Sequence, residues 1–151
     1  MITIQKVNPD DAARLSRIAY AAKAHWGYPA AWMEEWRDAF TFTREYFETN
    51  ESWAAELDDK PVAFCTLLDK DGIAWVENLW VLPEHMGLGI GRRLLLHAVE
   101  AARERGFNKL QLESDPNAAG FYARLGMHKI SERRADMDGQ SRALPLMEMI
   151  L

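Results

Sequence analysis

The chain has 151 residues, of which 48% are hydrophobic and 27% charged, a composition typical of a folded domain and not of a disordered chain. A net charge of −5 without a strongly basic, aromatic-rich stretch argues against a nucleic-acid partner, and no apolar run reaches the ~18 residues of a membrane helix. Because Cys65 is the only cysteine and no signal-peptide pattern begins the chain, we expect a cytoplasmic protein without disulfides or a metal site, folded as one domain over residues 1–151.

The first part of the chain predicts a strand followed by helices. Apolar and polar residues alternate from Ile2 to Val7, as they do in a short strand. Asn8-Pro9-Asp10-Asp11 ends this strand and suits a helix start, because carboxylates stabilise the positive end of a helix. Three helical segments are then expected: Ala12–Trp26, Ala30–Phe40 after the break at Gly27-Tyr28-Pro29, and a short one after Thr43.

The pattern then changes to strands joined by tight turns. Asp58-Asp59-Lys60 and Asp71-Gly72 are hairpin signals, and they join predicted strands over Ser52–Leu57, Pro61–Leu68 and Ile73–Val81. The elements expected after them are a helix over Arg92–Arg105, a strand over Lys109–Glu113, a helix from Asp115 to about Leu125, and strands over Met127–Arg133 and Ala143–Leu151. Together they predict an α/β (α+β) fold, a mixed sheet of about seven strands with flanking helices, in the order β-α-α-β-β-β-α-β-α-β-β.

A loop with three alternating glycines, Gly87, Gly89 and Gly91, lies between a predicted strand and a predicted helix. Glycine has no Cβ, so backbone amides can approach an anion closely, and the helix N-terminus that follows favours phosphate. The alternative is a tight turn that needs glycine only for its own geometry. The mononucleotide loop is excluded because Arg-Arg-Leu follows Gly91 where lysine and serine or threonine are required, and Arg92 occupies a position where the dinucleotide fingerprint requires glycine.

Two sequence blocks resemble the GNAT superfamily of N-acetyltransferases. Leu79–Leu95, LWVLPEHMGLGIGRRLL, is similar to the family's cofactor signature, in which a strand and a proline precede (Arg or Gln)-x-x-Gly-x-(Gly or Ala) at a helix start. Asp115–Gly126, DPNAAGFYARLG, is similar to the family's Asn…Phe-Tyr…Leu-Gly pattern. With the element order, the resemblance covers essentially the whole chain and implies a mostly antiparallel GNAT-like sheet. Met86 departs from the family's Arg or Gln, so any contact at that position falls to backbone amides.

The resemblance also implies where acetyl-CoA would bind. The strand that ends at Val81 would splay from Lys109–Glu113, and the pantetheine arm would lie in the gap. Backbone groups of Leu79, Trp80 and Val81 would pair with the arm as an added strand would. The pyrophosphate would be held by the amides of the loop: Met86, Gly87, Leu88, Gly89, Ile90, Gly91 and Arg92. Asn117 matches a family asparagine that hydrogen-bonds the arm, and a helix-start cap is its alternative role.

Two residues are candidate catalysts. Tyr122 matches the family tyrosine near the cofactor sulfur and could protonate the departing thiolate, which is the role we favour; the alternative is an aromatic that packs a helix on the sheet. Glu77 lies on the strand before the loop, where the family often places a base that acts through water. We expect it to be a buried acid; the alternative is a sheet-face charge paired with a neighbour such as an arginine. His85, close to the loop, is a second candidate.

Aromatic residues of the upstream helices are candidates for the acceptor site. In the family, the first two helices and their connection wall this site, which points to Trp26, Tyr28 and Trp32. Together with the nearby carboxylates, their ring faces would attract a cationic amine. Ordinary packing of a helix on the sheet is the alternative.

The expected function is therefore transfer of an acetyl group from acetyl-CoA to a primary amine of a small molecule or peptide, by direct attack in a ternary complex. A non-catalytic module that senses acyl-CoA is one alternative, and a protein that binds another nucleotide is a second. Because the family is often dimeric, a homodimer is a further expectation.

Overall fold

A computed structural model describes residues 1–151. Its seven strands are β1 (Ile2–Lys6), β2 (Ser52–Leu57), β3 (Lys60–Lys70), β4 (Ile73–Val81), β5 (Lys109–Glu113), β6 (His128–Met137) and β7 (Gln140–Ile150). Its five α-helices are α1 (Ala12–Ala24), α2 (Ala30–Trp36), α3 (Arg44–Thr49), α4 (Ile90–Glu104) and α5 (Ala119–Arg124). Short 3-10 turns lie at Pro9–Asp11, Arg37–Phe40, Pro83–His85 and Pro116–Ala118. None of the helices combines the length and the apolar character needed to span a bilayer.

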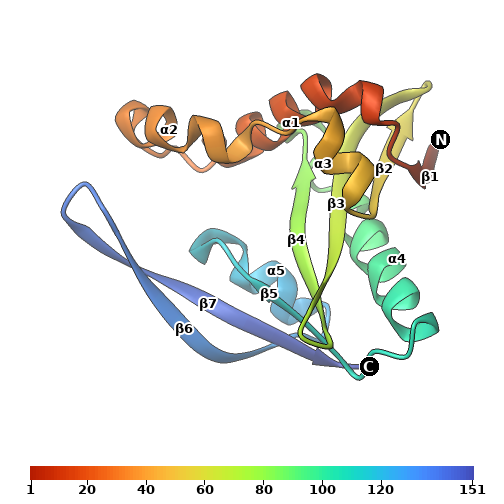
Figure 1. The fold of residues 1–151 in the computed structure, drawn as a ribbon. Coiled ribbons are helices and arrows are strands. Elements are labelled where there is room, and N and C mark those ends of the chain that lie inside the picture. The colour runs from red at the N-terminus through yellow and green to blue at the C-terminus, as the bar shows by residue number, and fades with distance from the viewer.

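The strands form one sheet in the order β1-β2-β3-β4-β5-β7-β6 (Figure 1). Every neighbouring pair is antiparallel except β4 and β5, which run parallel. The predicted mixed, mostly antiparallel sheet and its order of elements are therefore confirmed. Three helices are shorter than predicted: α1 ends at Ala24, α2 gives way to a 3-10 turn at Arg37, and a 3-10 turn precedes α5.

The hairpins form where the turn residues predicted them. Asp58 and Asp59 have φ of 51° and 64°, and Asp71 and Gly72 have φ of 53° and 84°. Two successive left-handed residues match the right-handed twist of the strands they join. The two turns thus align β2, β3 and β4 as a meander.

Helices cover both faces of this meander. Alternating side chains point to opposite faces of a strand, so Ala54 and Phe64 pack with α1 and α3, and Ala55 and Cys65 pack with α4. On α4 one apolar stripe is buried, which includes Ile90, Leu94, Leu95, Ala98, Val99 and Ala102. This packing fixes the start of α4 against the end of β4.

The parallel pairing of β4 with β5 is short. It joins Ala74 to Leu110 and Trp75 to Gln111 and extends no further. On its other side β4 carries a bulge, because Thr66 pairs with Asn78 while Leu67 pairs with Val76, which leaves Glu77 as an extra residue. A bulge bends its strand and increases the local twist. The end of β4 consequently diverges from β5, as the resemblance implied, and one backbone edge of Leu79–Val81 has no strand partner (Figure 1).

Candidate active site

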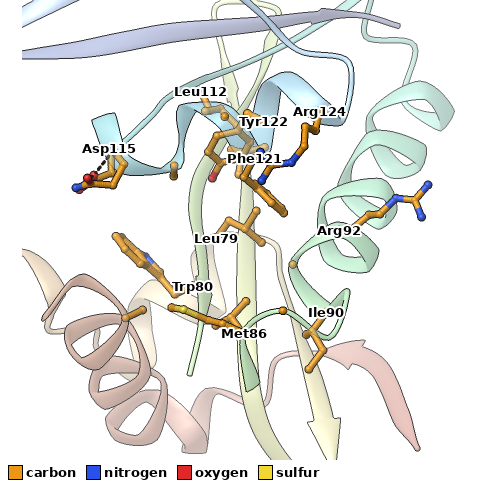
Figure 2. Close-up of a pocket in the computed structure, with 18 of the residues that line it drawn as sticks. Leu79, Trp80, Met86, Ile90, Arg92, Leu112, Asp115, Phe121, Tyr122 and Arg124 are labelled. Carbon is orange, nitrogen blue, oxygen red and sulfur yellow. Dashed lines mark hydrogen bonds between the residues drawn. The ribbon is translucent and has the colours of Figure 1, made fainter. Parts of the chain in front are cut away.

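A cavity of about 460 Å³ lies where β4 and β5 separate. Its walls come from the end of β4, the glycine loop, the end of β5, the turn and helix around α5, and one side of α1 (Figure 2). Many of the residues expected to bind cofactor line it: Leu79, Trp80, Val81, Met86, Gly87, Gly89, Ile90, Gly91, Arg92, Asn117 and Tyr122. Leu88 does not, and its side chain is exposed.

The three glycines of the loop have two different structural roles. Gly87 and Gly89 both have φ of 80°, in the left-handed region, and a Cβ at either would meet open space. Gly91 has an ordinary helical backbone, but a Cβ there would lie 3.3 Å from Cζ of Phe121. Gly87 and Gly89 therefore shape the loop, whereas Gly91 lets an aromatic ring pack on the first turn of α4. For Gly87 and Gly89 the turn geometry considered as the alternative therefore applies, alongside any close approach of an anion to the loop.

The glycine loop ends at a helix N-terminus with free donors. Gly89 is the N-cap of α4 and offers no side chain to the helix, so the first amides of α4 have no intrahelical acceptor. Arg92 and Arg124 also line this part of the cavity. Arg93 faces elsewhere and donates to the carbonyl of Ile2 at 3.2 Å. The arrangement suits an anionic group with several oxygen acceptors.

Tyr122 is buried on α5, with its hydroxyl directed into the cavity (Figure 2). Phe121 contacts the ring edge-on at a centroid distance of 5.1 Å. Burial raises the pKa of Tyr122 well above its usual value, so the hydroxyl keeps its proton. Both roles considered for Tyr122 coexist, because the ring belongs to the core while the hydroxyl lines the cavity.

Glu77 lines the cavity, but the expectation of a buried acid is wrong, because its side chain is 41% exposed. It accepts a hydrogen bond of 2.8 Å from Nε1 of Trp75, and Nζ of Lys70 lies 3.8 Å away. The reason is the bulge, which turns the extra residue of β4 away from the core. The alternative of a paired surface charge fits better, with lysine rather than arginine as the partner.

A second carboxylate in the cavity, Glu113, was not singled out from the sequence. It lies at the end of β5 and accepts two hydrogen bonds of 2.8 Å from Arg133 on β6. These bonds hold the pKa of Glu113 below its usual range. Only the fold brings β5 and β6 together, so no local pattern could have found this pair. His85 also lines the cavity.

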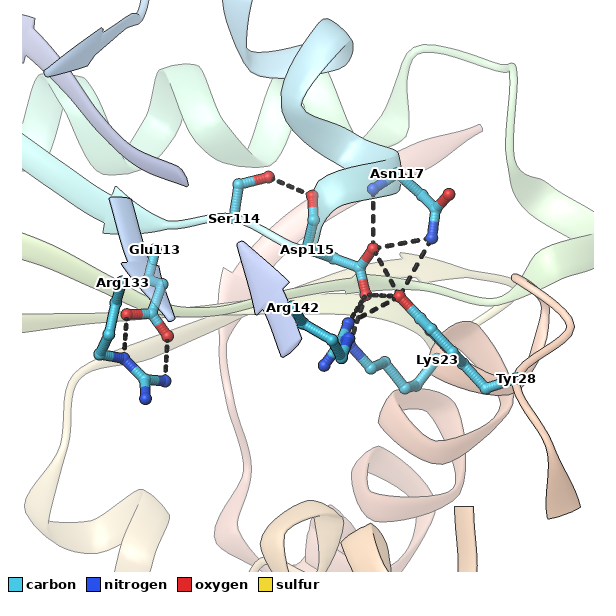
Figure 3. A network of polar contacts seen from close by, with 8 residues as sticks. All are labelled: Lys23, Tyr28, Glu113, Ser114, Asp115, Asn117, Arg133 and Arg142. Carbon is cyan, nitrogen blue, oxygen red and sulfur yellow. Dashed lines mark hydrogen bonds and ion pairs between the residues drawn. The ribbon is translucent and has the colours of Figure 1, made fainter. Parts of the chain in front are cut away.

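Asp115, which lines the cavity, is the centre of a polar cluster (Figure 3). It caps the 3-10 turn before α5 by accepting from the backbone N–H of Asn117 at 2.8 Å. It also pairs with Lys23 of α1, accepts from the hydroxyl of Tyr28 at 2.8 Å, and lies 3.8 Å from Nη2 of Arg142 on β7. The cap of this turn is therefore Asp115, and not Asn117 as one alternative had it.

The charged side chains of this cluster are mostly buried. The side chains of Lys23, Asp115 and Arg142 are 10%, 7% and 13% exposed. Desolvation lowers the pKa of Lys23, against the opposing effect of Asp115. Burial alone would raise the pKa of Asp115, but its bonds to Lys23, Asn117 and Tyr28 hold it below the usual range. Burial and Asp115 together raise the pKa of Tyr28 to about 12.

The aromatic residues predicted for the acceptor site divide into two groups. Trp26 lines the cavity and is 39% exposed. Tyr28 and Trp32 do not line it; their rings stack on each other at 5.8 Å, and Trp32 is buried. The cations over these rings are the protein's own, since Lys23 and Arg142 lie 4.9 and 5.0 Å from the centroid of Tyr28. Of the three residues predicted for the acceptor wall, Trp26 alone therefore lines this cavity, and Tyr28 and Trp32 do not.

Cys65 is buried in the core, and burial raises its pKa to about 12, which agrees with a packing role. No group of three or more His, Cys, Asp and Glu side chains is arranged to hold a metal ion.

Comparison with known proteins identifies the architecture. The model of the acetyltransferase (GNAT) family matches residues 18–127. The [ribosomal protein bS18]-alanine N-acetyltransferase of Salmonella typhimurium is 32% identical over 118 residues, which are 70% of this chain and 78% of that protein. The chain belongs to the GNAT family. It is accordingly an enzyme of the N-acetyltransferase class, as the two sequence blocks had implied.

Solved structures of other GNAT proteins share the fold. A GCN5-related N-acetyltransferase from Rhodopseudomonas palustris superposes with a TM-score of 0.83 at 24% identity, over 99% of this chain and 95% of that one. PaiA N-acetyltransferase from Thermoplasma acidophilum, solved in complex with coenzyme A, superposes with a TM-score of 0.78 at 21% identity, over 100% of this chain and 99% of that one. The splayed sheet therefore belongs to a fold that binds coenzyme A in at least one neighbour.

Proposed function

We propose that this GNAT protein transfers an acetyl group from acetyl-CoA to a primary amine of a small molecule or a peptide, by direct attack in a ternary complex. The observation that carries the proposal is the continuity of one cavity, which joins the unpaired edge of β4, the glycine loop and the hydroxyl of Tyr122. Its wall residues are spread from Ala22 on α1 to Arg124 on α5, so we also propose that residues 1–151 act as one domain.

The residues present fit the cofactor. The free edge of Leu79–Val81 offers backbone groups to the amides of a pantetheine arm. The glycine loop and the first turn of α4 offer amides to a pyrophosphate, with Arg92 and Arg124 as nearby cations. The side chain of Met86 carries no charge, so at this position the backbone amide would contact the pyrophosphate. Bound acetyl-CoA would supply an activated thioester at the end of the arm.

The proton transfers can then be assigned to side chains. The amine nitrogen attacks the carbonyl carbon, so a C–N bond forms as the C–S bond breaks. Glu77 would accept, through a water molecule, the proton that an ammonium acceptor must lose before it attacks. The nitrogen loses a second proton to water as the amide forms, while Tyr122 would give its proton to the leaving sulfur and regain one from water. Glu77, Glu113 and Asp115 all line the cavity. Glu113 and Asp115 are held by Arg133 and Lys23, so Glu77, 3.8 Å from Lys70, is the carboxylate that would favour an acceptor arriving as an ammonium ion.

The experiment is a calorimetric titration with CoA, ATP and NAD, followed by a thiol-release assay with acetyl-CoA and a panel of amines. The panel includes small diamines, amino acids, and peptides with an N-terminal alanine or an internal lysine. We expect binding of CoA alone among the three ligands, and thiol release with at least one amine. Binding of CoA without turnover on any amine would favour the sensor module. Binding of ATP or NAD but not CoA would refute the proposal.

A further inference from the structure

The amide of Asn117 can take only one orientation in this structure. Its Nδ2 lies 3.0 Å from Oδ1 of Asp115 and 3.1 Å from the hydroxyl of Tyr28. An ionised carboxylate only accepts hydrogen bonds, so the NH₂ group and not the carbonyl of Asn117 must face it. Carbonyl Oδ1 of Asn117 is left facing away from the cluster without a partner in the protein (Figure 3).

The hydroxyl of Tyr28 is the junction that completes this arrangement. It donates its single proton to Asp115, with oxygen distances of 2.8 and 3.0 Å. Its oxygen accepts from Nδ2 of Asn117 at 3.1 Å and from Nη2 of Arg142 at 2.9 Å. A phenol has one proton to give and two lone pairs to offer, so every bonding position of Tyr28 is used.

The donor direction at Tyr28 is also fixed. Arginine has no acceptor and stays protonated, so the Arg142 contact must be donated to Tyr28. The proton of Tyr28 is held by Asp115, so a flipped Asn117 would set its carbonyl against two oxygens that have no proton to give. Both the carboxylate and the phenol therefore exclude the flipped amide.

Tyr28 does not line the cavity, whereas Asn117 does. Any influence of Tyr28 on a ligand in the cavity must then pass through its partners. The partners come from two distant parts of the chain, because Tyr28 lies 89 positions from Asn117 and 114 positions from Arg142.

We infer that Tyr28 is a positioning residue, which together with Asp115 orients Asn117 so that carbonyl Oδ1 is offered to an N–H donor of the coenzyme arm. This inference rests on the proposed function, since it concerns the same cavity. Arg142 extends the arrangement to β7, because its guanidinium takes the remaining lone pair of the Tyr28 hydroxyl. The segment between α1 and α2 thus contributes to cofactor binding without touching the cofactor.

The test is the Tyr28→Phe variant, which keeps the stacked ring and removes only the hydroxyl. The hydroxyl bonds Asp115, Asn117 and Arg142, and the bond to Asn117 is the one that orients the ligand-binding amide. Its loss should weaken CoA affinity about three- to tenfold by calorimetry. The KM for acetyl-CoA should rise by a similar factor, while kcat at saturating acetyl-CoA changes less than about twofold. In an Asn117→Ala background, Tyr28→Phe should have no further effect on CoA affinity, because the amide it orients is gone.

The matched control is Tyr20→Phe. Tyr20 also accepts a hydrogen bond from an arginine, Arg37, at 3.3 Å, but it lies outside the cavity and has no link to Asn117. Its removal should leave CoA affinity unchanged. Asn117→Asp is a second variant that keeps the size of the side chain; it removes both Nδ2 donors and should lose at least as much CoA affinity as Asn117→Ala.

The outcomes distinguish failure of the positioning role of Tyr28 from failure of the proposed function. The positioning role is overturned if Tyr28→Phe lowers CoA affinity equally in the wild type and in the Asn117→Ala background. It is also overturned if a folded Tyr28→Phe variant loses no CoA affinity. Either result leaves the proposed function standing. A normal CoA affinity for Asn117→Asp overturns the positioning role independently. Failure of the wild-type protein to bind CoA refutes the proposed function itself, and the inference with it.

Discussion

Tyr122 combines two properties that a proton donor to a thiolate needs. Its ring is fixed by the core around α5, so the position of the hydroxyl is defined. Its pKa is raised by burial, so the proton is present at any ordinary pH. Loss of that proton therefore does not limit the rate at alkaline pH, and the deletion of the hydroxyl is the informative change.

We expect Tyr122→Phe to lower kcat at least about tenfold, because general acid catalysis commonly contributes more than that. The ring and its contact with Phe121 remain, so CoA affinity should change less than about twofold. Steady-state kinetics and calorimetry on the same preparation check both expectations. An unchanged kcat would exclude Tyr122 as the acid.

Glu77 is tested by the pH dependence of its removal. An amine with a pKa near 10 is almost entirely protonated at about pH 6, and a base is most needed there. Glu77→Gln should accordingly lower kcat/KM more at about pH 6 than at about pH 9. Glu113→Gln is the comparison, since both carboxylates line the cavity. A loss that is flat across pH for Glu77→Gln, or a pH-dependent loss that follows Glu113 instead, would contradict the assignment.

At the scale of elements, the two ends of α4 allow the effect of a substitution on backbone strain to be distinguished from its effect on ligand binding. Gly89 and Gly106 stand at opposite ends of α4, with φ of 80° and 82°, and a Cβ at either meets open space. Alanine in the left-handed region costs about 1–2 kcal/mol. The two positions are therefore equivalent in strain, and they differ in that Gly89 lines the cavity and Gly106 does not.

We predict that Gly89→Ala and Gly106→Ala lose similar stability, about 1–2 kcal/mol each in urea unfolding. Gly89→Ala alone should also weaken CoA binding, at least about tenfold, because it changes the path of the amides that would face the pyrophosphate. Equal CoA affinities for the two variants would show that the loop does not hold the cofactor.

The predictable features were those that local chemistry decides. Paired Asp and Gly residues set the hairpins, and the glycines and the proline set the junction of β4 with α4. The exposure of Glu77 was missed because it depends on a bulge, which is defined by pairing with β3 and leaves no local signal. The 3-10 turns were missed because they differ from α-helix by one residue in hydrogen-bond spacing.

At the scale of the whole molecule, contacts between distant segments decide what the aromatic residues do. Tyr28 and Trp32 carry the same rings in either role, and their sequence neighbours do not distinguish them. Arg142, on a strand 114 positions after Tyr28, places its guanidinium over the Tyr28 ring, where the cation of an acceptor was expected from the sequence. The single carboxylate Asp115 then binds together α1, β7 and the turn before α5.

This cluster should make stability depend on acid pH. The pKa of Asp115 in the folded protein is held below its usual range by its bonds to Lys23, Asn117 and Tyr28, so the unfolded chain binds a proton first as pH falls. The stabilisation by the Asp115 carboxylate is fully present above the pKa of Asp115 in the unfolded chain. It is lost as the pH drops through the pKa of Asp115 in the folded protein. Asp115→Asn should lower the free energy of unfolding by about 3 kcal/mol near neutral pH, because it leaves Lys23 and Arg142 without their carboxylate. Below about pH 4, the free energy of unfolding of the variant should fall less steeply with pH than that of the wild type.

Urea unfolding followed by circular dichroism, from about pH 7 to about pH 3, measures both effects. Asp10→Asn is the control, because the ion pair of Asp10 with Arg44 is exposed and should contribute little. If Asp115→Asn lost stability in acid as steeply as the wild type, the carboxylate would not be the group that links these three elements to pH. The acid sensitivity would then have to come from carboxylates elsewhere, such as Glu113, whose pKa is also held below its usual range.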